Sequence, residues 1–541
     1  MAAVNIHTLP RDDTIKYIVK YLDDGHVINL SMSCKELREQ LACHIFHTVR
    51  FSNDPKISNS ALIAAQKHGH HVRVLRFVGF AGEEDDNQQS QNEHPRPTNR
   101  DVLPYSALIL FEANAALLPN LETIVINFDH DYGEADEYGP HGPSIFINHE
   151  SLADVRQREA KLTMCRLWAN TYKALAANKG TPNLVIESWS PRGVSTFQTK
   201  AWKAYMRRVK SLDITIVCET LAFEFTNSLQ GYGRDVGAMQ QFFFQWLDLV
   251  TTLKVSMLWP VTPFGMNGKY HIPLPMRTNG SMPVLGHLEL KHVFISEDLL
   301  NLIIGHKEHL HTVVLHNAHS ALAKYGECAT RGISWKDFFD CLTMALNQEG
   351  GLALTTFTFT STAPLSETEA KTEKINYKSE RAAIKKLRDQ LQNDPSRRLF
   401  GYGDMGEISG TFIHDIKTNQ DSAIAGEDQT AYERFVKRLE VNRQRISNTK
   451  QPMQCEKGQA EITQLVQCFE TMEGLGAVIH NTDAPISQTV GRMKGYREPG
   501  ASRKKHDSTP SSSNGTMSLT DSRSPEDTGL RRSARLANKT T

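Results

Sequence analysis

The sequence predicts a mixed α+β or α/β protein: short amino-terminal helices, then an irregular array of alternating strands and helices, then a disordered tail. Three observations support this. Apolar residues recur at helical spacing near the amino terminus, and one strand-like apolar pattern recurs between residues 53 and 365. From about residue 491 the composition shifts to Ser, Thr, Pro, Asn, Arg and Lys, which cannot form a core. At 541 residues, the chain is long enough for about two or three domains.

The bulk composition excludes several classes of protein. A formal net charge of +0 gives no global attraction to nucleic acid or to anionic membranes. We find neither an apolar run long enough for a membrane span nor a secretory signal over Met1–Pro10, so we expect a location in cytosol or nucleus. The eight cysteines form no CxxC pair, and we expect reduced, buried thiols.

The amino-terminal segment predicts three short helices. Leu9-Pro10 begins the first, because proline suits a helix start. Ile15, Ile18 and Leu22 then recur on one face of that helix. Residues 27–30 predict a second helix and residues 35–46 a third. A module this small buries little apolar surface alone, which indicates that one side docks onto a partner or a neighbouring domain.

One part of this segment has a specific resemblance. Leu9-Pro10, Tyr21-Leu22 and the run Leu30-Ser31-Met32-Ser33-Cys34-Lys35-Glu36-Leu37-Arg38 resemble the F-box family. Two features depart from it: the first two pairs lie one residue further apart than usual, and Ser33 and Leu37 replace the commoner Val and Trp. The resemblance covers residues 5–52 and implies docking onto the Skp adaptor of a cullin-RING ubiquitin ligase.

The resemblance also implies a set of adaptor contacts. The expected contact residues are Leu9, Pro10, Ile15, Ile18, Leu22, Leu30, Cys34 and Leu37. The alternative is that the same residues pack on one another as an internal helical core.

Residues 53–365 repeat the order apolar, two residues, apolar, one residue, apolar. The copies are Val72-Leu75-Phe77, Leu121-Ile124-Ile126, Val209-Leu212-Ile214, Val250-Leu253-Val255, Leu285-Leu288-Leu290, Leu310-Val313-Leu315 and Leu354-Phe357-Phe359. The alternating final pair predicts a strand with one buried face, and helices are predicted between copies, as over 298–304 and 335–346. This arrangement resembles an irregular leucine-rich repeat, although regular repeats of that class recur every 20–29 residues or so. A single irregular α/β domain is the alternative.

Several motifs predict loops instead of chemistry. Residues 82–101 are polar and predict a disordered loop, and the acidic residues over 129–144 lack calcium-loop spacing. Gly401–Gly406 matches GxGxxG without the flanking strand and helix of a dinucleotide site, so we interpret it as a turn. His68, His70 and His71 lack the spacing of a metal site and are interpreted as loop residues. No cofactor, metal site or enzymatic motif is predicted.

Residues 366–490 predict a closing segment, with a mostly exposed helix over 366–393 and further helices over 431–446 and 457–475. Residues 491–541 predict a disordered basic tail, with 11 Lys/Arg against 5 Asp/Glu from residue 492 onward. The candidate nuclear-localisation residues are Arg503, Lys504, Lys505, Arg531, Arg532 and Arg535. The alternative is a basic tail that serves only solubility.

These predictions favour one function. The chain is expected to be a substrate receptor, which binds the Skp adaptor and a target protein while a ligase partner performs the chemistry. One alternative is a scaffold protein with a vestigial F-box. Another is a nuclear protein that binds through its basic tail, which the neutral overall charge disfavours.

Overall fold

The computed structural model describes most of the chain between residues 19 and 448. The segments within that range that are not described are 81–101, 113–115, 130–150, 181–182, 218–229, 258–262, 267–270, 277–280, 322–331, 349, 367–381, 395 and 406–411. The chain divides into two units, Met1–Thr463 and Gln464–Thr541, and all described residues belong to the first. The predictions for the first helix, the loop 82–101, nearly all of the acidic loop, the helix 457–475 and the tail lie outside the described residues.

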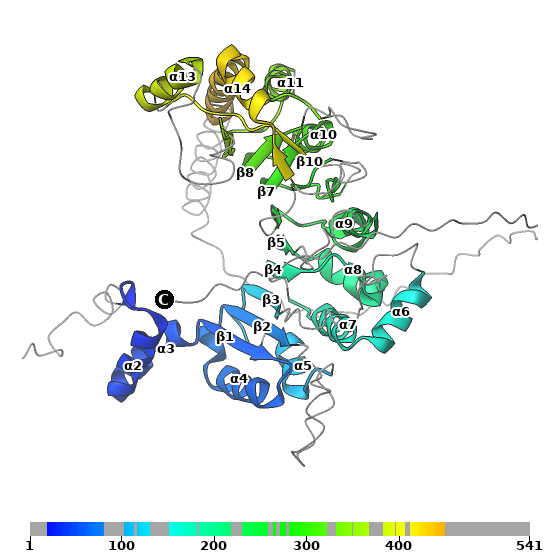
Figure 1. Ribbon diagram of the computed structural model, residues 1–541. Coiled ribbons are helices and arrows are strands. Elements are labelled where there is room, and N and C mark those ends of the chain that lie inside the picture. The colour runs from blue at the N-terminus through cyan, green and yellow to red at the C-terminus, as the bar shows by residue number, and fades with distance from the viewer. Residues whose placement is uncertain are drawn as a thin grey trace, which may run out of the picture. The chain divides into compact units, whose positions relative to one another are not determined.

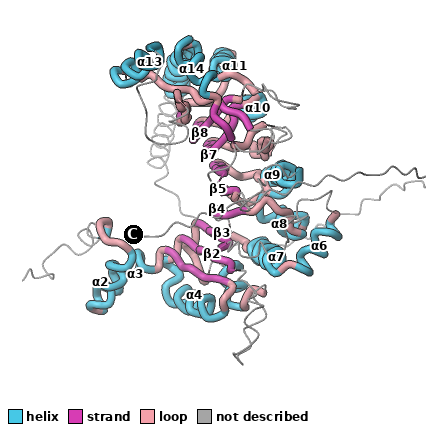
Figure 2. Tube along the Cα trace, in the orientation of Figure 1, coloured by secondary structure: helices cyan, strands magenta, loops and turns pink. Residues whose placement is uncertain are grey.

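Nine parallel strands form one sheet, and they neighbour one another in chain order (Figures 1 and 2). The strands are β1 (Thr48–Ser52), β2 (Val74–Phe80), β3 (Thr123–Asp129), β4 (Asn183–Trp189), β5 (Ser211–Ile216), β6 (Thr252–Met257), β7 (His287–Ile295), β8 (Thr312–Ser320) and β9 (Thr356–Phe359). This order requires a crossover between each pair of strands, because parallel neighbours cannot be joined by a tight turn. The result is a mixed α/β architecture.

Helices supply most of the crossovers, and Figure 2 shows them along one side of the sheet. The helices are α2 (Asp24–Ser33), α3 (Lys35–Ile45), α4 (Pro55–His68), α5 (Tyr105–Glu112), α6 (Leu152–Lys161), α7 (Thr163–Ala176), α8 (Lys200–Met206), α9 (Gln230–Phe242), α10 (Glu297–Gly305), α11 (Trp335–Asn347), α13 (Ala382–Asn393), α14 (Ile416–Ala425) and a helix over 427–448. Short 3-10 turns lie at Gly69–His71, Ser195–Gln198 and Phe244–Trp246.

All seven copies of the apolar pattern lie on the sheet, as predicted. In the copy on β7, Leu285, Leu288 and Leu290 are completely buried, whereas Glu289 between them faces the other way. Side chains alternate across a strand, so the two leucines of the strand face the helices while Glu289 lies on the opposite face. Each buried leucine contributes about 2 kcal/mol of apolar transfer free energy.

Local signals fix where the helices begin and end. Asp54 accepts hydrogen bonds from the backbone N–H groups of Lys56 and Ile57, and Pro55 occupies the first turn of α4. Ser296 and Ser334 cap α10 and α11 in the same way. Such caps satisfy N–H groups that have no partner within the helix.

The structure corrects two predictions and bears out a third for the described residues. The GxGxxG segment is not a turn, because Gly403–Met405 forms strand β10 and pairs antiparallel with β11 (Phe412–His414). The helix α13 is mostly exposed, as predicted, with Ile384 and Leu387 buried on its apolar stripe. Cys34 and Cys43 are exposed thiols, whereas Cys165 is buried as expected.

Candidate interaction surfaces

The amino-terminal helices α2 and α3 pack on each other just before β1. Asp23 caps α2 by accepting a hydrogen bond from the N–H of His26. Cys34 ends α2 and begins α3, and its Sγ accepts a hydrogen bond from the N–H of Leu37 at 3.4 Å. Cys34 and Leu37 therefore belong to one helix start, where the thiol serves as the cap.

The expected adaptor contacts divide into two groups in the structure. Leu22, Leu30 and Leu37 are half-buried and Cys34 is exposed, so these four keep surface available to a partner. Leu9, Pro10, Ile15 and Ile18 lie outside the described residues, as do all six nuclear-localisation candidates.

Three large apolar side chains that were not among the expected contacts are exposed on the same module. The exposed fractions are 68% for Tyr21, 48% for Ile28 and 62% for Met32. Ile28 and Met32 lie one helical turn apart on α2, so they share one face. An i, i+4 apolar pair is the signal that sequence reasoning missed here.

The second surface is the open face of the sheet, which we define as the face opposite the helices. Its central row contains one residue from each strand in direct register. In strand order the central row is Arg50, Arg76, Val125, Val185, Asp213, Lys254, Glu289, Val314 and Thr358.

Glu289 is the centre of the charged part of this row. Lys254 Nζ lies 2.7 Å from Glu289 Oε2, and His316 Nε2 lies 3.3 Å from Oε1. Burial by itself would raise the pKa of Glu289, but the Lys254 ammonium holds that pKa below its usual value. The same contact raises the pKa of Lys254. The pair is therefore ionised across the neutral range.

A second ion pair spans three strands of the open face. Arg76 on β2 forms two hydrogen bonds with Glu187 on β4, one of them 2.8 Å from Nη1 to Oε1. Val125, on the strand between them, lies opposite Arg76 in register. Bidentate pairing of this kind fixes the orientation of the guanidinium as well as its charge.

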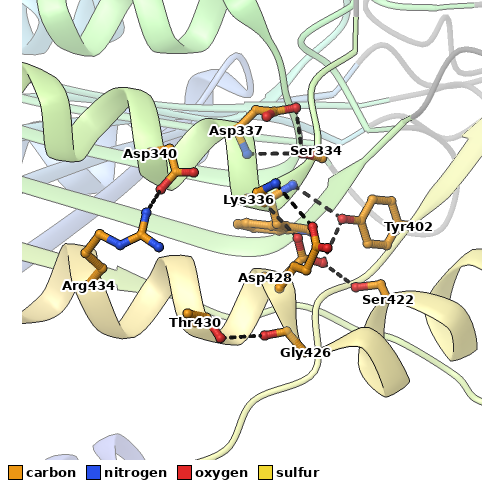
Figure 3. A network of polar contacts seen from close by, with 12 residues as sticks. Ser334, Lys336, Asp337, Asp340, Tyr402, Ser422, Gly426, Asp428, Thr430 and Arg434 are labelled. Atoms are coloured by element: carbon orange, nitrogen blue, oxygen red, sulfur yellow. Dashed lines mark hydrogen bonds and ion pairs between the residues drawn. The ribbon is translucent and has the colours of Figure 1, made fainter.

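The closing segment packs on the last strand, where Phe357 contacts Phe435 and Phe359 contacts Tyr432. In this segment a buried carboxylate joins three elements (Figure 3). Asp428 accepts hydrogen bonds from the N–H of Lys336 at 2.9 Å and from the hydroxyl of Tyr402 at 2.7 Å. Ser422 donates a third. This network holds α14 and the helix over 427–448 against the start of α11, and it is structural in character.

Three histidines gather where β10 and β11 meet the carboxyl ends of β7 and β8. His271 Nε2 lies 3.0 Å from Asp404 Oδ1, and the ring of His319 lies against those of Phe412 and His414. No group of three or more His, Cys, Asp or Glu residues within the described part of the chain is arranged to hold a metal ion. His68, His70 and His71 close α4 and its following 3-10 turn.

None of the helices in the described part of the chain is both long and apolar enough to cross a bilayer.

Searches for related proteins gave no match to this chain among protein-family models, curated proteins or solved structures.

Proposed function

We propose that this chain is an F-box substrate receptor, which binds the Skp adaptor of a cullin-RING ubiquitin ligase through its amino-terminal helices and a target protein through the sheet domain. The observation that carries the proposal is the uninterrupted run from Tyr21 to Arg38, which resembles the family and lies on two helices with exposed apolar residues. Exposed apolar surface on so small a module is typical of a protein-binding face.

The proposal includes the repeat class of the sheet domain. We infer that its strand–helix units are irregular leucine-rich repeats, because each unit adds one parallel strand beside the previous one. The first position of the pattern is buried just before the strand, as Val72 and Leu310 illustrate. Repeat proteins bind partners on extended surfaces, which favours the sheet domain as the target-binding part.

A pull-down with purified Skp adaptor tests the proposal. The variants are a Leu9→Ala/Pro10→Ala double substitution and an Ile28→Asp/Met32→Asp double substitution. We expect both to recover much less adaptor than the unmodified chain, because a buried charge or a lost apolar contact weakens a hydrophobic interface.

The matched control is Ile63→Asp on α4, where an equally exposed apolar side chain lies outside the proposed docking face. This variant should recover as much adaptor as the unmodified chain. Equal recovery by all four proteins would reject adaptor docking through this face and would favour the scaffold alternative.

A further inference from the structure

Two charged side chains of the central row, Arg50 and Asp213, make no direct ion pair with another described residue. Arg50 is exposed on β1 and makes no ion pair there, and its neighbour in register is a second cation, Arg76. Like charges directly opposite on neighbouring strands repel each other. Arg76 is neutralised by Glu187, so Arg50 remains as the net positive charge at this end of the row.

Asp213 is the opposite case at the middle of the row. Its carboxylate receives no hydrogen bond from any described residue, because the neighbouring Lys254 is engaged by Glu289. Burial raises the pKa of Asp213. The positive charge of Lys254 offsets this effect only in part, and the negative charges of Glu289 and Glu187 add to it. A half-buried carboxylate without a donor is costly, and a cation from outside would relieve that cost.

The positions between these two charges are apolar or already satisfied. Val125 and Val185 occupy the row on β3 and β4. Val125 is buried and Val185 is partly exposed, and Arg76 is held by Glu187. From β1 to β5, the open face is therefore cationic at Arg50, apolar at Val185 and anionic at Asp213. Four strand spacings separate β1 from β5, which is about 19 Å, or about six residues of extended chain.

We propose that the open face binds a target segment that crosses the strands, with an acidic group over Arg50, an apolar side chain over Val185, and a basic side chain over Asp213. The inference specifies the target-binding half of the proposed function and rests on it. The acidic group is a carboxylate or a phosphate, since both suit a guanidinium.

Synthetic peptides test the spacing. Each fluorescent peptide carries one acidic residue, then Ala and Val, then one Lys, with a separation that varies from about two to about ten residues around the expected six. Two series use Glu or phosphoserine as the acidic residue, which distinguishes the carboxylate from the phosphate source. Binding to the full chain is measured by fluorescence anisotropy at low salt, where exposed charges are least screened.

Charge-reversal variants test the register. Arg50→Glu and Asp213→Lys should each weaken binding of the best peptide several-fold, and the double variant about tenfold. The double variant should bind a peptide with Lys first and Glu last better than the unmodified chain does, which also proves that it is folded. The control is Lys56→Glu/Glu308→Lys, an equivalent reversal at exposed positions on and beside the helices, which should change nothing.

Each outcome of these experiments either supports or overturns the proposed binding of a target segment to the open face. A binding optimum near six residues with reciprocal rescue supports the inference. Binding that ignores the spacing, or equal loss in the control variant, overturns it. Adaptor recovery measured on the same preparations is independent of Arg50 and Asp213, so a failure here is distinguishable from a failure of the proposed function.

Discussion

The hydroxyl of Tyr402 donates a 2.7 Å hydrogen bond to Asp428, and this contact links the segment that leads into β10 to the helix over 427–448. The same hydroxyl also lies 3.4 Å from the N–H of Trp335, at the start of α11. Burial and the Asp428 carboxylate together raise the pKa of Tyr402, so its hydroxyl keeps its proton. The contact thereby joins the closing segment to the end of the sheet domain.

Replacing Asp428 with Ala should destabilise the protein by about 2 to 3 kcal/mol, because several buried donors lose a charged acceptor. Urea unfolding followed by tryptophan fluorescence measures the change in the free energy of unfolding. The control is Asp340→Ala, which removes a partly exposed ion pair with Arg434 and should cost about 1 kcal/mol or less. Equal losses in the two variants would contradict a special role for Asp428.

Gly426 ends α14 with φ +70° and ψ 10°, a left-handed conformation that favours glycine. Gly426→Ala should therefore lower the free energy of unfolding by about 1 kcal/mol. Gly426→Asn should cost less, because Asn tolerates this conformation better than other residues with a side chain. The added side chain would not clash with its surroundings, because nothing lies within 4 Å of a Cβ at this position. Thermal unfolding measures the stability of both variants. If Gly426→Ala is as stable as Gly426→Asn, or more stable, this explanation is rejected.

Two buried histidines should make stability depend on pH. Burial lowers the pKa of His292 to about 4 and that of His319 to about 3, with Lys291 and His414 adding to the respective effects. In the unfolded chain both titrate near 6.5, so below that pH the unfolded state binds more protons than the folded state. Their contribution is complete above about pH 6.5 and is lost as the pH falls, toward about 4 for His292 and toward about 3 for His319.

The slope attributable to each histidine is about 1.4 kcal/mol per pH unit in that window. Urea midpoints between neutral pH and about pH 4.5 measure it. His292→Asn and His319→Gln should each flatten the curve, although either substitution lowers stability at neutral pH. Curves of unchanged steepness would show that other groups cause the acid sensitivity.

The sequence predicts the sheet well because its signal is local. Each apolar triplet, such as Leu285-Leu288-Leu290, carries its own strand and its own buried face. Two strands were missed. In β1 the pattern begins with an aromatic, Phe46-Val49-Phe51, and in β4 a polar Thr181 occupies the first position before Leu184.

The candidate surfaces were harder to predict, because they depend on register between distant segments. Arg76 and Glu187 are 111 residues apart, and only the order of β2, β3 and β4 brings them together. The residues between the apolar positions of each copy carry the sequence signal for the open face. Side chains alternate across a strand, so polar residues at these positions lie on the face opposite the helices. The helix α13 was easier to predict, because its apolar spacing is local: most of its described residues are exposed, and Ile384 and Leu387 are buried.

The Arg76–Glu187 pair should contribute measurable coupling across the sheet. A double-mutant cycle with Arg76→Ala and Glu187→Ala isolates it from the effects of each single change. We expect a coupling free energy of about 1 kcal/mol, because the pair is bidentate but about a third exposed. Salt should reduce the coupling, and strictly additive single effects would argue against a direct interaction in solution.

Direct binding of the intact chain to purified Skp adaptor, measured by isothermal titration calorimetry, is the decisive measurement. The account predicts saturable binding at one adaptor per chain, with affinity reduced at least about tenfold by Ile28→Asp/Met32→Asp and unchanged by Ile63→Asp. If titration of the unmodified chain with the adaptor gives no detectable heat of binding, the account is contradicted. An equal loss of affinity in the docking-face variant and the control variant would contradict it too.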